Sequence, residues 1–139
     1  MEFIKRNTDY ALRALAYMAA RSNRGVFSIS EIAAVEQIPE DFLRKIFQKL
    51  TGAGLLVSSR GPRGGFSLAR DPREITVREI VEAIQGRIAI NRCLLGRDAC
   101  EHFDKCKLRE SWTGIQMAFV NFLEGISLQD LAKQQHNSE

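Results

Sequence analysis

The sequence predicts a mainly α-helical fold that carries one small β-wing and ends in a long helix. Three observations lead to this prediction. Apolar residues recur at helical spacing over residues 7–52, a glycine-rich turn separates two short apolar runs between Leu55 and Leu68, and large apolar side chains recur every three or four residues from Leu108 to Ile126. With 139 residues, 45% of them hydrophobic and 27% charged, the chain has the composition and length of a globular protein with one core.

Three helices are expected in the first part of the chain. The first spans residues 7–21, and the second is a short helix capped by Ser30. The third begins at Pro39, and its buried stripe is expected to contain Phe42, Leu43, Ile46, Phe47 and Leu50. Its outer face is polar and basic, with Arg44, Lys45, Gln48 and Lys49. Two helices joined by a tight turn, the second with a basic outer face, are typical of a helix-turn-helix.

The stretch "GLLVSSRGPRGGFSLAR", residues 54–70, predicts a β-hairpin beside this unit. The expected strands are Leu55–Ser59 and Phe66–Leu68, and the loop between them holds two arginines among glycines and a proline. The glycines allow the tip to approach a surface closely, so that Arg60 and Arg63 can reach phosphates or the minor groove. The alternative is a plain hairpin whose arginines contact only water. The neighbouring basic helix favours a wing that contacts DNA.

Positive charge is concentrated in the same segment. The net charge of the chain is +3, and residues 40–70 contain six basic residues against two acidic ones. This distribution fits a nucleic-acid partner, although a solvated basic face is the alternative. We therefore predict contacts with a double-stranded DNA operator from Ser30, Arg44, Lys45, Gln48, Lys49, Arg60, Arg63 and Gly64. No catalytic residues are predicted, because no paired carboxylates, nucleophile–base motif or phosphate loop stands in a convincing context.

The remaining chain completes the expected domain organisation. We predict a winged helix-turn-helix domain over residues 1–86, a cysteine-bearing loop over 87–105, and a dimerisation helix with a tail over 106–139. The heptad-like spacing on the last long helix favours a homodimer interface over core packing, through Leu108, Trp112, Ile115, Phe119 and Phe122. The start has no signal-peptide pattern and no apolar run reaches a membrane span, so a cytoplasmic protein without membrane contact is predicted.

All the cysteines lie in one polar, irregular segment, "CLLGRDACEHFDKC", as Cys93, Cys100 and Cys106. An odd count of cysteines in a cytoplasmic chain argues against a disulfide framework and favours metal ligands or redox thiols. A structural zinc site with His102 is one alternative, although its cysteines are usually closer in sequence. An iron–sulfur cluster fits soft thiolates on wide loops. A metal-free thiol switch, or three unrelated thiols, are the other interpretations.

These segments, together with "NTDYALRALAYMA", "SISEIA" and "GISLQDLA", resemble the Rrf-type winged-helix transcription regulators, a family that includes IscR, NsrR, RirA and CymR. The resemblance implies a cytoplasmic homodimer that binds a pseudo-palindromic operator, with repression the favoured effect. In members with three cysteines it implies an iron–sulfur cluster that senses nitric oxide, redox state or iron and cluster supply. The alternatives are the same regulator with a zinc site or a thiol switch, or a winged helix that binds protein.

The resemblance also implies a fourth cluster ligand. In IscR-like members this ligand is a histidine three residues after the last cysteine, where this chain has Arg109, which cannot ligate iron. In NsrR-like members it is an aspartate of the first helix, supplied by the partner subunit, and Asp9 occupies that place. We therefore expect Asp9 as the fourth ligand of a cluster of the 4Fe–4S or 2Fe–2S type, with His102 as the second choice.

Overall fold

The computed structural model describes residues 1–136; residues 137–139, which belong to the predicted tail, lie outside the described residues. In chain order the elements are α1 (Arg6–Ala20), η1 (Ser22–Arg24), α2 (Ile29–Glu36), α3 (Glu40–Gly52), β1 (Leu56–Ser59), β2 (Gly65–Leu68), α4 (Val77–Gln85), η2 (Arg92–Leu95), η3 (Arg97–Ala99), α5 (Leu108–Glu124) and α6 (Leu128–His136). The prediction of a mainly helical fold with a small wing is confirmed. No helix of the described chain is long and apolar enough to cross a membrane.

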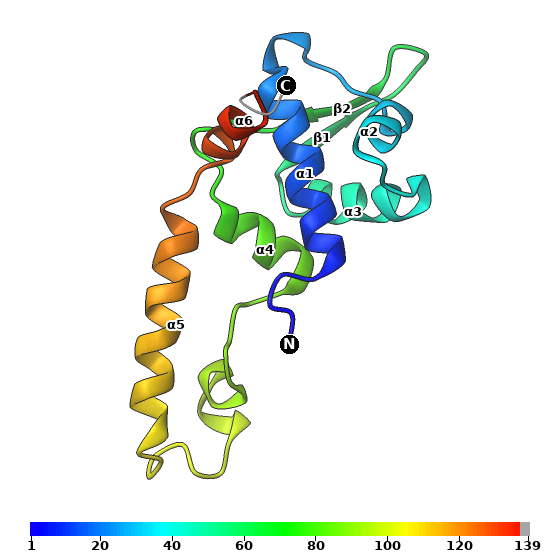
Figure 1. Cartoon of the computed structure of the whole chain (residues 1–139). Helices are drawn as coiled ribbons and strands as arrows, with labels where there is room; N and C mark the ends of the chain where they lie inside the picture. Colours follow the sequence, from blue (N-terminus) through cyan, green and yellow to red (C-terminus); the bar gives the residue numbers. More distant parts are fainter. Residues whose placement is uncertain (137–139) are drawn as a thin grey trace.

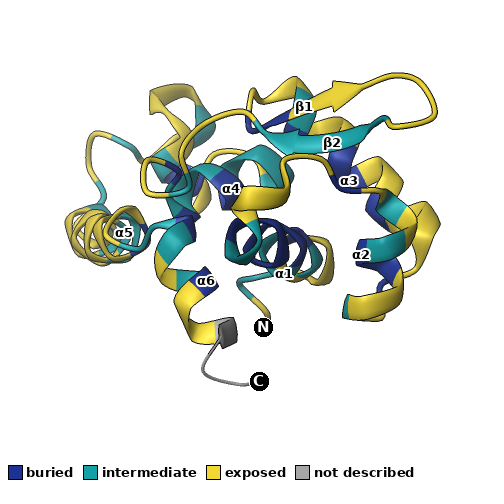
Figure 2. Ribbon diagram, turned by 90° about the horizontal axis from the view of Figure 1, so that it is seen from above, coloured by how far each residue is buried: buried dark blue, intermediate teal, exposed yellow. Residues whose placement is uncertain are grey.

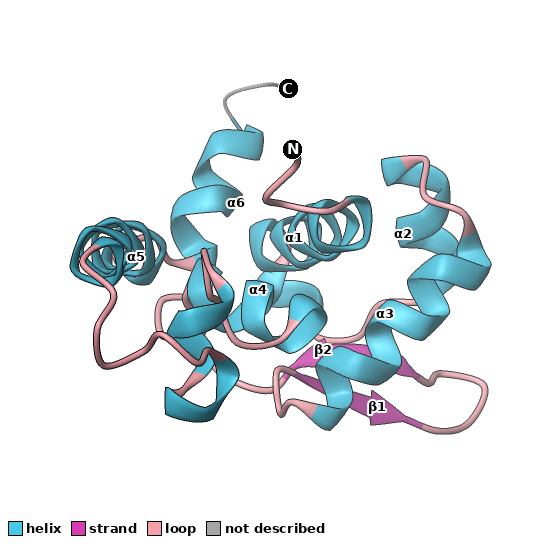
Figure 3. Ribbon diagram, turned by 90° about the horizontal axis from the view of Figure 1, so that it is seen from below, coloured by secondary structure: helices cyan, strands magenta, loops and turns pink. Residues whose placement is uncertain are grey.

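Helix α1 forms the centre of the body, surrounded by α2, α3, α4 and α6 (Figures 1 and 3). Its sequence places alanines between larger apolar residues, and Ala11, Ala14, Leu15 and Met18 are fully buried. Small side chains allow neighbouring helices to pack closely on several sides of α1. Figure 2 shows the contrast with α5, which stands apart and is largely exposed. Helix α1 therefore connects the helix-turn-helix, the wing strand β2, α4 and α6 within one core.

Helices α2 and α3 form the expected helix-turn-helix. The predicted cap of α2 is wrong: Ser28, not Ser30, accepts a hydrogen bond from the Glu31 backbone N–H at 3.2 Å, so the helix begins two residues earlier than expected. The turn between the helices depends on Gln37, which has a left-handed backbone with φ of 54°. Pro39 then stands immediately before α3, where its missing N–H is tolerated.

Four apolar residues of α3, namely Leu43, Ile46, Phe47 and Leu50, are buried as predicted. Phe42 was expected in the same stripe, but the structure exposes 49% of its surface. The reason is geometric: at 100° per residue, Phe42 is rotated by one position from Leu43, toward the polar side of the helix. Its place on α3 is therefore on the face that carries the basic residues.

Strands β1 and β2 pair antiparallel, with Leu56 opposite Leu68 and Ser59 opposite Gly65. A third chain segment joins the hairpin, because Phe27 and Phe66 exchange two backbone hydrogen bonds of 2.8 and 2.7 Å. The ring of Phe66 also packs edge-on against Phe47 of α3, with centroids 5.0 Å apart. These contacts fix the base of the wing against the helix-turn-helix.

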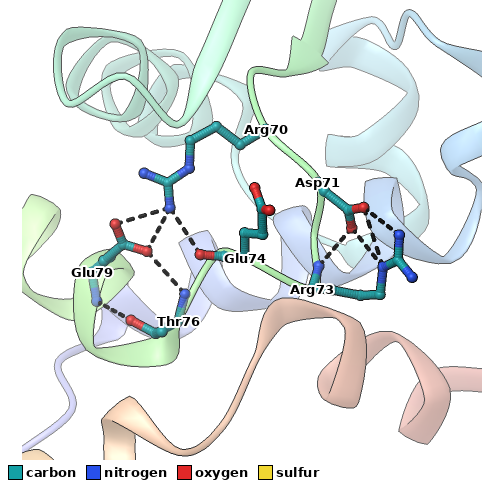
Figure 4. A network of polar contacts seen from close by, with 6 residues as sticks. All are labelled: Arg70, Asp71, Arg73, Glu74, Thr76 and Glu79. Carbon is teal, nitrogen blue, oxygen red and sulfur yellow. Dashed lines mark hydrogen bonds and ion pairs between the residues drawn. The ribbon is translucent and has the colours of Figure 1, made fainter.

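The segment after the wing is held by a polar network (Figure 4). Arg70 donates to both carboxylate oxygens of Glu79 at 2.7 and 2.9 Å, and Glu79 forms a reciprocal capping box with Thr76 at the start of α4. The hydrogen bond from Arg70 lowers the pKa of Glu79, and hydrogen bonds from Arg73 lower the pKa of Asp71 to about 2. Arg70, although part of the basic segment, is thus committed to an intramolecular ion pair.

The chain returns to the body after α5. Ser127 and Asp130 cap α6 reciprocally, at 2.9 and 3.1 Å. The Leu128 backbone N–H donates to the Ile75 carbonyl at 2.8 Å, and α6 packs along α1. The last helix therefore belongs to the same core as the winged unit.

Candidate DNA-binding surface and cysteine pocket

The outer face of α3 is exposed along its length and carries Arg44, Lys45, Gln48 and Lys49. Arg44 is partly neutralised, because its Nη2 donates to Glu40 Oε1 at 2.9 Å. The same oxygen accepts a hydrogen bond from Ser30 Oγ on α2 at 3.4 Å. Glu40 thus connects Ser30 to Arg44, and the sequence offered a signal for it in the i,i+4 spacing of Glu40 and Arg44.

The wing tip presents two more arginines. Within residues 1–136, Arg60 and Arg63 make neither a hydrogen bond nor an ion pair, and both are exposed. Gly64 closes the turn by donating its backbone N–H to the Gly61 carbonyl at 2.9 Å. A Cβ on Gly64 would lie 2.2 Å from the Ser59 carbonyl oxygen, so only glycine fits there. The tip is a tight turn whose two cations are available for an external anion.

A second ion pair fixes the orientation of α2. Arg24 donates from its two terminal nitrogens, Nη1 and Nη2, to the two carboxylate oxygens of Glu31, the second bond being 2.9 Å long. The Tyr17 hydroxyl donates to the same carboxylate at 3.1 Å. The bonds from Arg24 lower the pKa of Glu31. Because Tyr17 lies on α1, this network holds α2 at a fixed angle to the central helix.

The three cysteines line one open pocket of about 490 Å³, together with His102, Asp98 and Glu101. All three thiols are free; Cys93 is buried, and Cys100 and Cys106 are half-buried. The pocket walls come from η2, η3, the loop that follows, and Trp112 of α5. Two contacts fix the loop: the Ile90 N–H donates to Gln116 Oε1 at 3.0 Å, and Arg97 pairs with Asp104 at 2.7 Å.

The donor set of this pocket is rich in thiols, which are soft ligands for iron. Within the described chain, no group of three or more His, Cys, Asp or Glu side chains is arranged to hold one ion. The protein ligands of an iron–sulfur cluster bind to different irons, singly in the 4Fe–4S type and in pairs in the 2Fe–2S type, so they need not all converge on one point. Soft thiolates are the ligands that such clusters use. Cys93, Cys100 and Cys106 are the residues that would hold it.

The two candidates for a fourth ligand lie in different places. His102 is exposed and lines the cysteine pocket of its own chain. Asp9 lies on α1, with 56% of its side chain exposed, and pairs with Arg13 at 3.6 Å. Asp9 is not among the described residues that line the cysteine pocket of its own chain.

Comparison with known proteins decides the family. The model of the Rrf2 family, described as "Iron-dependent Transcriptional regulator", matches residues 4–134. The chain belongs to the Rrf2 family. This result confirms the resemblance found in the sequence, and it makes the chain a DNA-binding transcription regulator of helix-turn-helix type.

Two relatives and two solved structures extend the match. The chain is 34% identical over 131 residues to the HTH-type transcriptional regulator NsrR of Oceanobacillus iheyensis, covering 94% of this chain and 89% of the relative. It is 32% identical over 126 residues to IscR of Photorhabdus laumondii, covering 91% of this chain and 76% of the relative.

Two solved structures have the same fold. CymR, the global cysteine regulator of B. subtilis, superposes with a TM-score of 0.80 at 28% identity, covering 96% of this chain and 98% of that structure. IscR of T. potens superposes with 0.79 at 25% identity, covering 99% and 91%. These relatives are regulators, which confirms that the Rrf2 chain is not an enzyme.

The residues predicted to form the dimer interface lie in two rows on helix α5 of this Rrf2 chain. Leu108, Ile115 and Phe122, each seven residues apart, are 58%, 54% and 69% exposed. Trp112 and Phe119 are half-buried and face their own chain: Trp112 lines the cysteine pocket, and the ring of Phe119 packs against Phe3 with centroids 4.3 Å apart. The sequence spacing showed one stripe and did not distinguish these two rows.

Proposed function

We propose that this Rrf2 chain is a homodimeric regulator, favouring repression, whose DNA binding is controlled by an iron–sulfur cluster held by Cys93, Cys100 and Cys106. The observation that carries the proposal is the gathering of three free thiols in one open pocket. The family description, "Iron-dependent", and the similarity to IscR and NsrR support it. When bound, the cluster supplies a group that reacts with oxidants or nitric oxide and that depends on iron supply.

The DNA-binding surface is proposed to be the outer face of α3 with the wing. Arg44, Lys45 and Gln48 would face base edges in the major groove. Lys49 and the wing arginines would hold phosphates or the minor groove, since no partner within residues 1–136 neutralises them. On binding, the Arg44 guanidinium would exchange its hydrogen bond to Glu40 for contacts with DNA.

The dimer is proposed to form through the exposed row of α5. This helix has 17 residues, of which only Leu123 is buried among its own chain. Helices in proteins gain most of their stability from packing, and a row of exposed Leu108, Ile115 and Phe122 is costly in water. Packing against the same row of a second copy would bury these side chains. It would also bring two helix-turn-helix units into a fixed spacing for a pseudo-palindromic operator.

The signal is proposed to travel through α1. If Asp9 reaches the pocket of the partner subunit, ligation would hold the first helix of one chain against the cysteine loop of the other. Because α1 packs against α2 and α3, a small displacement of α1 would move the helix-turn-helix. A coupling of about 1–3 kcal/mol between the two states is typical of such regulation.

A thiol switch without metal is the second candidate. It is favoured by the similarity to CymR, a cysteine regulator, and by the position of the half-buried Cys100 and Cys106 in the same open pocket. In that case oxidation of the thiols would alter the loop beside α5. A zinc site with His102 would need a rearrangement of the described side chains, since they form no such group.

The proposed cofactor is tested by an absorption spectrum with iron, sulfide and zinc analysis on protein purified without oxygen. Broad visible absorption with matched iron and sulfide is expected, and Cys100→Ser should abolish it. Ser111→Ala is the matched control, because Ser111 is exposed on α5 and lies outside the described lining of the pocket. Stoichiometric zinc, or no metal with reversible thiol oxidation, would contradict the cluster.

The fourth ligand and the coupling are tested on the same preparations. Asp9→Ala should change the spectrum and remove the dependence of operator affinity on the cluster, whereas His102→Ala should leave both unchanged. The reverse result would assign the fourth ligand to His102. Circular dichroism spectra of both variants control for folding.

A further inference from the structure

A basic groove lies between the start of α1, the C-terminal half of α3 and the end of α4. It has a volume of about 420 Å³ and is lined by Lys5, Arg6, Asn7, Thr8, Lys49, Ile84 and Gln85. Three of these residues are cations and none is a carboxylate. Within the described chain, the side chains of Lys5, Arg6 and Lys49 make no ion pair. The groove therefore gathers positive charge without a partner.

The shape of the groove is fixed by Gln85. Its Oε1 accepts hydrogen bonds from the Lys5 backbone N–H, at 3.0 Å, and from the Thr8 hydroxyl. Its Nε2 donates to the Phe3 carbonyl oxygen at 3.0 Å. Thr8 is fully buried, so these bonds tie the start of α1 firmly to α4. The groove is thus built from fixed backbone, and the Lys5 side chain takes no part in holding it.

The nearest carboxylate on α1 does not neutralise the groove. Asp9 lies one turn beyond Lys5, and it pairs with Arg13 at 3.6 Å on the side toward α2. Like charges confined to one groove repel one another, and this repulsion is relieved when an anion binds among them. The arrangement of Lys5, Arg6 and Lys49 therefore suits an anionic ligand.

The groove is continuous with the proposed DNA-binding surface, because Lys49 belongs to both. Counting along α3, Phe42, Lys45 and Lys49 fall on one side of its outer face, at i, i+3 and i+7, and this row ends at the groove. In Figures 1 and 3, α3 lies between the tip of the wing and the start of α1. A duplex held by α3 and by the wing would have its backbone near the groove at the other end of α3.

We propose that this groove binds a backbone phosphate of the same DNA duplex, through Lys5, Arg6 and Lys49. The proposal rests on the proposed placement of α3 and the wing on DNA. It adds a third phosphate contact, made by α1, to those of α3 and the wing. In a dimer there are two such grooves, so two further phosphates per operator would be held.

The test compares the salt dependence of DNA binding in Arg6→Ala and Lys5→Ala with that of the wild type. The probe is a fluorescent duplex that the wild-type protein has selected from a random-sequence pool. Because each neutralised phosphate contributes about 0.9 to the slope of log K against log salt, loss of one contact per subunit should reduce the slope by about 2. We expect affinity to fall by about tenfold at physiological salt, with little change in sequence preference.

Lys133→Ala is the matched control, because it removes one exposed cation from α6, away from the groove. It should leave the slope unchanged. Phosphate ethylation interference on the same duplex should show one phosphate per half-site whose effect disappears in Arg6→Ala, and thermal unfolding shows whether each variant is folded. Unchanged slopes in both groove variants, or the same reduction in Lys133→Ala, would overturn the proposal. If the wild type itself shows no salt-dependent binding, the proposed DNA surface as a whole is wrong.

Discussion

The attachment of the wing makes Gly65→Ala the most informative single substitution for the fold. A Cβ at position 65 would lie 2.3 Å from the carbonyl oxygen of Phe27, well inside van der Waals contact. The Phe27 oxygen is a backbone atom and the Cβ is bonded directly to the backbone, so neither atom can rotate away. Relief requires β2 and the segment at Phe27 to separate by about 1 Å, since ordinary contacts of carbon with oxygen begin above 3 Å.

That separation breaks the bridge between the two segments. The hydrogen bonds of Phe27 and Phe66 are 2.8 and 2.7 Å long, and about 1 Å more places both beyond hydrogen-bond distance. Each backbone hydrogen bond contributes about 0.5–1.5 kcal/mol net, so losing both costs about 1–3 kcal/mol. For a domain of this size we expect Tm to fall by about 3–10 °C. DNA affinity should fall as well, because the wing loses one of its anchors.

Urea and thermal unfolding measure the stability of Gly65→Ala against the wild type and against Gly52→Ala. Gly52 ends α3, and no atom lies within 4 Å of a Cβ built there. This control should be as stable as the wild type or slightly more so, because alanine restricts the unfolded chain. Wild-type stability in Gly65→Ala would refute the close approach of β2 to Phe27 and the wing geometry derived from it.

Three further predictions concern the wing, the polar network and the dimer. Arg63→Ala should reduce the salt slope of DNA binding by about 2 for the two wings of a dimer, with unchanged sedimentation. Arg70 lowers the pKa of Glu79 below 4.5, so the Glu79 carboxylate stabilises the fold above about pH 4.5 and loses this effect as the pH falls through the lowered pKa. Unfolding measured at pH 7 and at pH 3 should therefore show a smaller loss of stability in acid for Glu79→Gln than for the wild type. Phe122→Lys should convert the dimer to monomer in analytical ultracentrifugation, while a dimer of wild-type affinity would contradict the α5 interface.

Much of the fold follows from local patterns in the sequence. The buried stripe of α3 and the glycine turn of the wing are encoded over a few residues, and both are found where the periodicity predicts them. Local patterns failed where two solutions differ by one or two residues. Ser28 and Ser30 are both good caps, and the hydrogen bond to Glu31 decides for Ser28. Phe42 is apolar and adjacent to the stripe, but its position around the helix leaves it exposed.

The candidate site depends more on tertiary contacts that spacing does not show. The sequence placed the cysteines and His102 in one segment, but it did not show that Trp112 of α5 joins the same pocket. The basic groove combines Lys5 and Arg6 with Lys49, more than forty positions away. The packing of α1, α3 and α4 on one another, together with the bonds of Gln85, brings these segments together. No periodic signal relates residues of such different sequence position.

The start of α1 is the point where the proposed cofactor and the proposed DNA surface meet. Lys5 and Arg6 line the groove proposed for phosphate, and Asp9, on the next turn of the same helix, is the proposed ligand of the partner's cluster. Since α1 is buried at the centre of the body and packs against α3, we expect a displacement of Asp9 to shift both the groove and α3. Cluster loss would then alter phosphate contacts directly as well as the spacing of the two recognition helices. Arg6→Ala should consequently reduce the difference in affinity between cluster-bound and cluster-free protein, and an undiminished difference would assign the whole coupling to the spacing of α3.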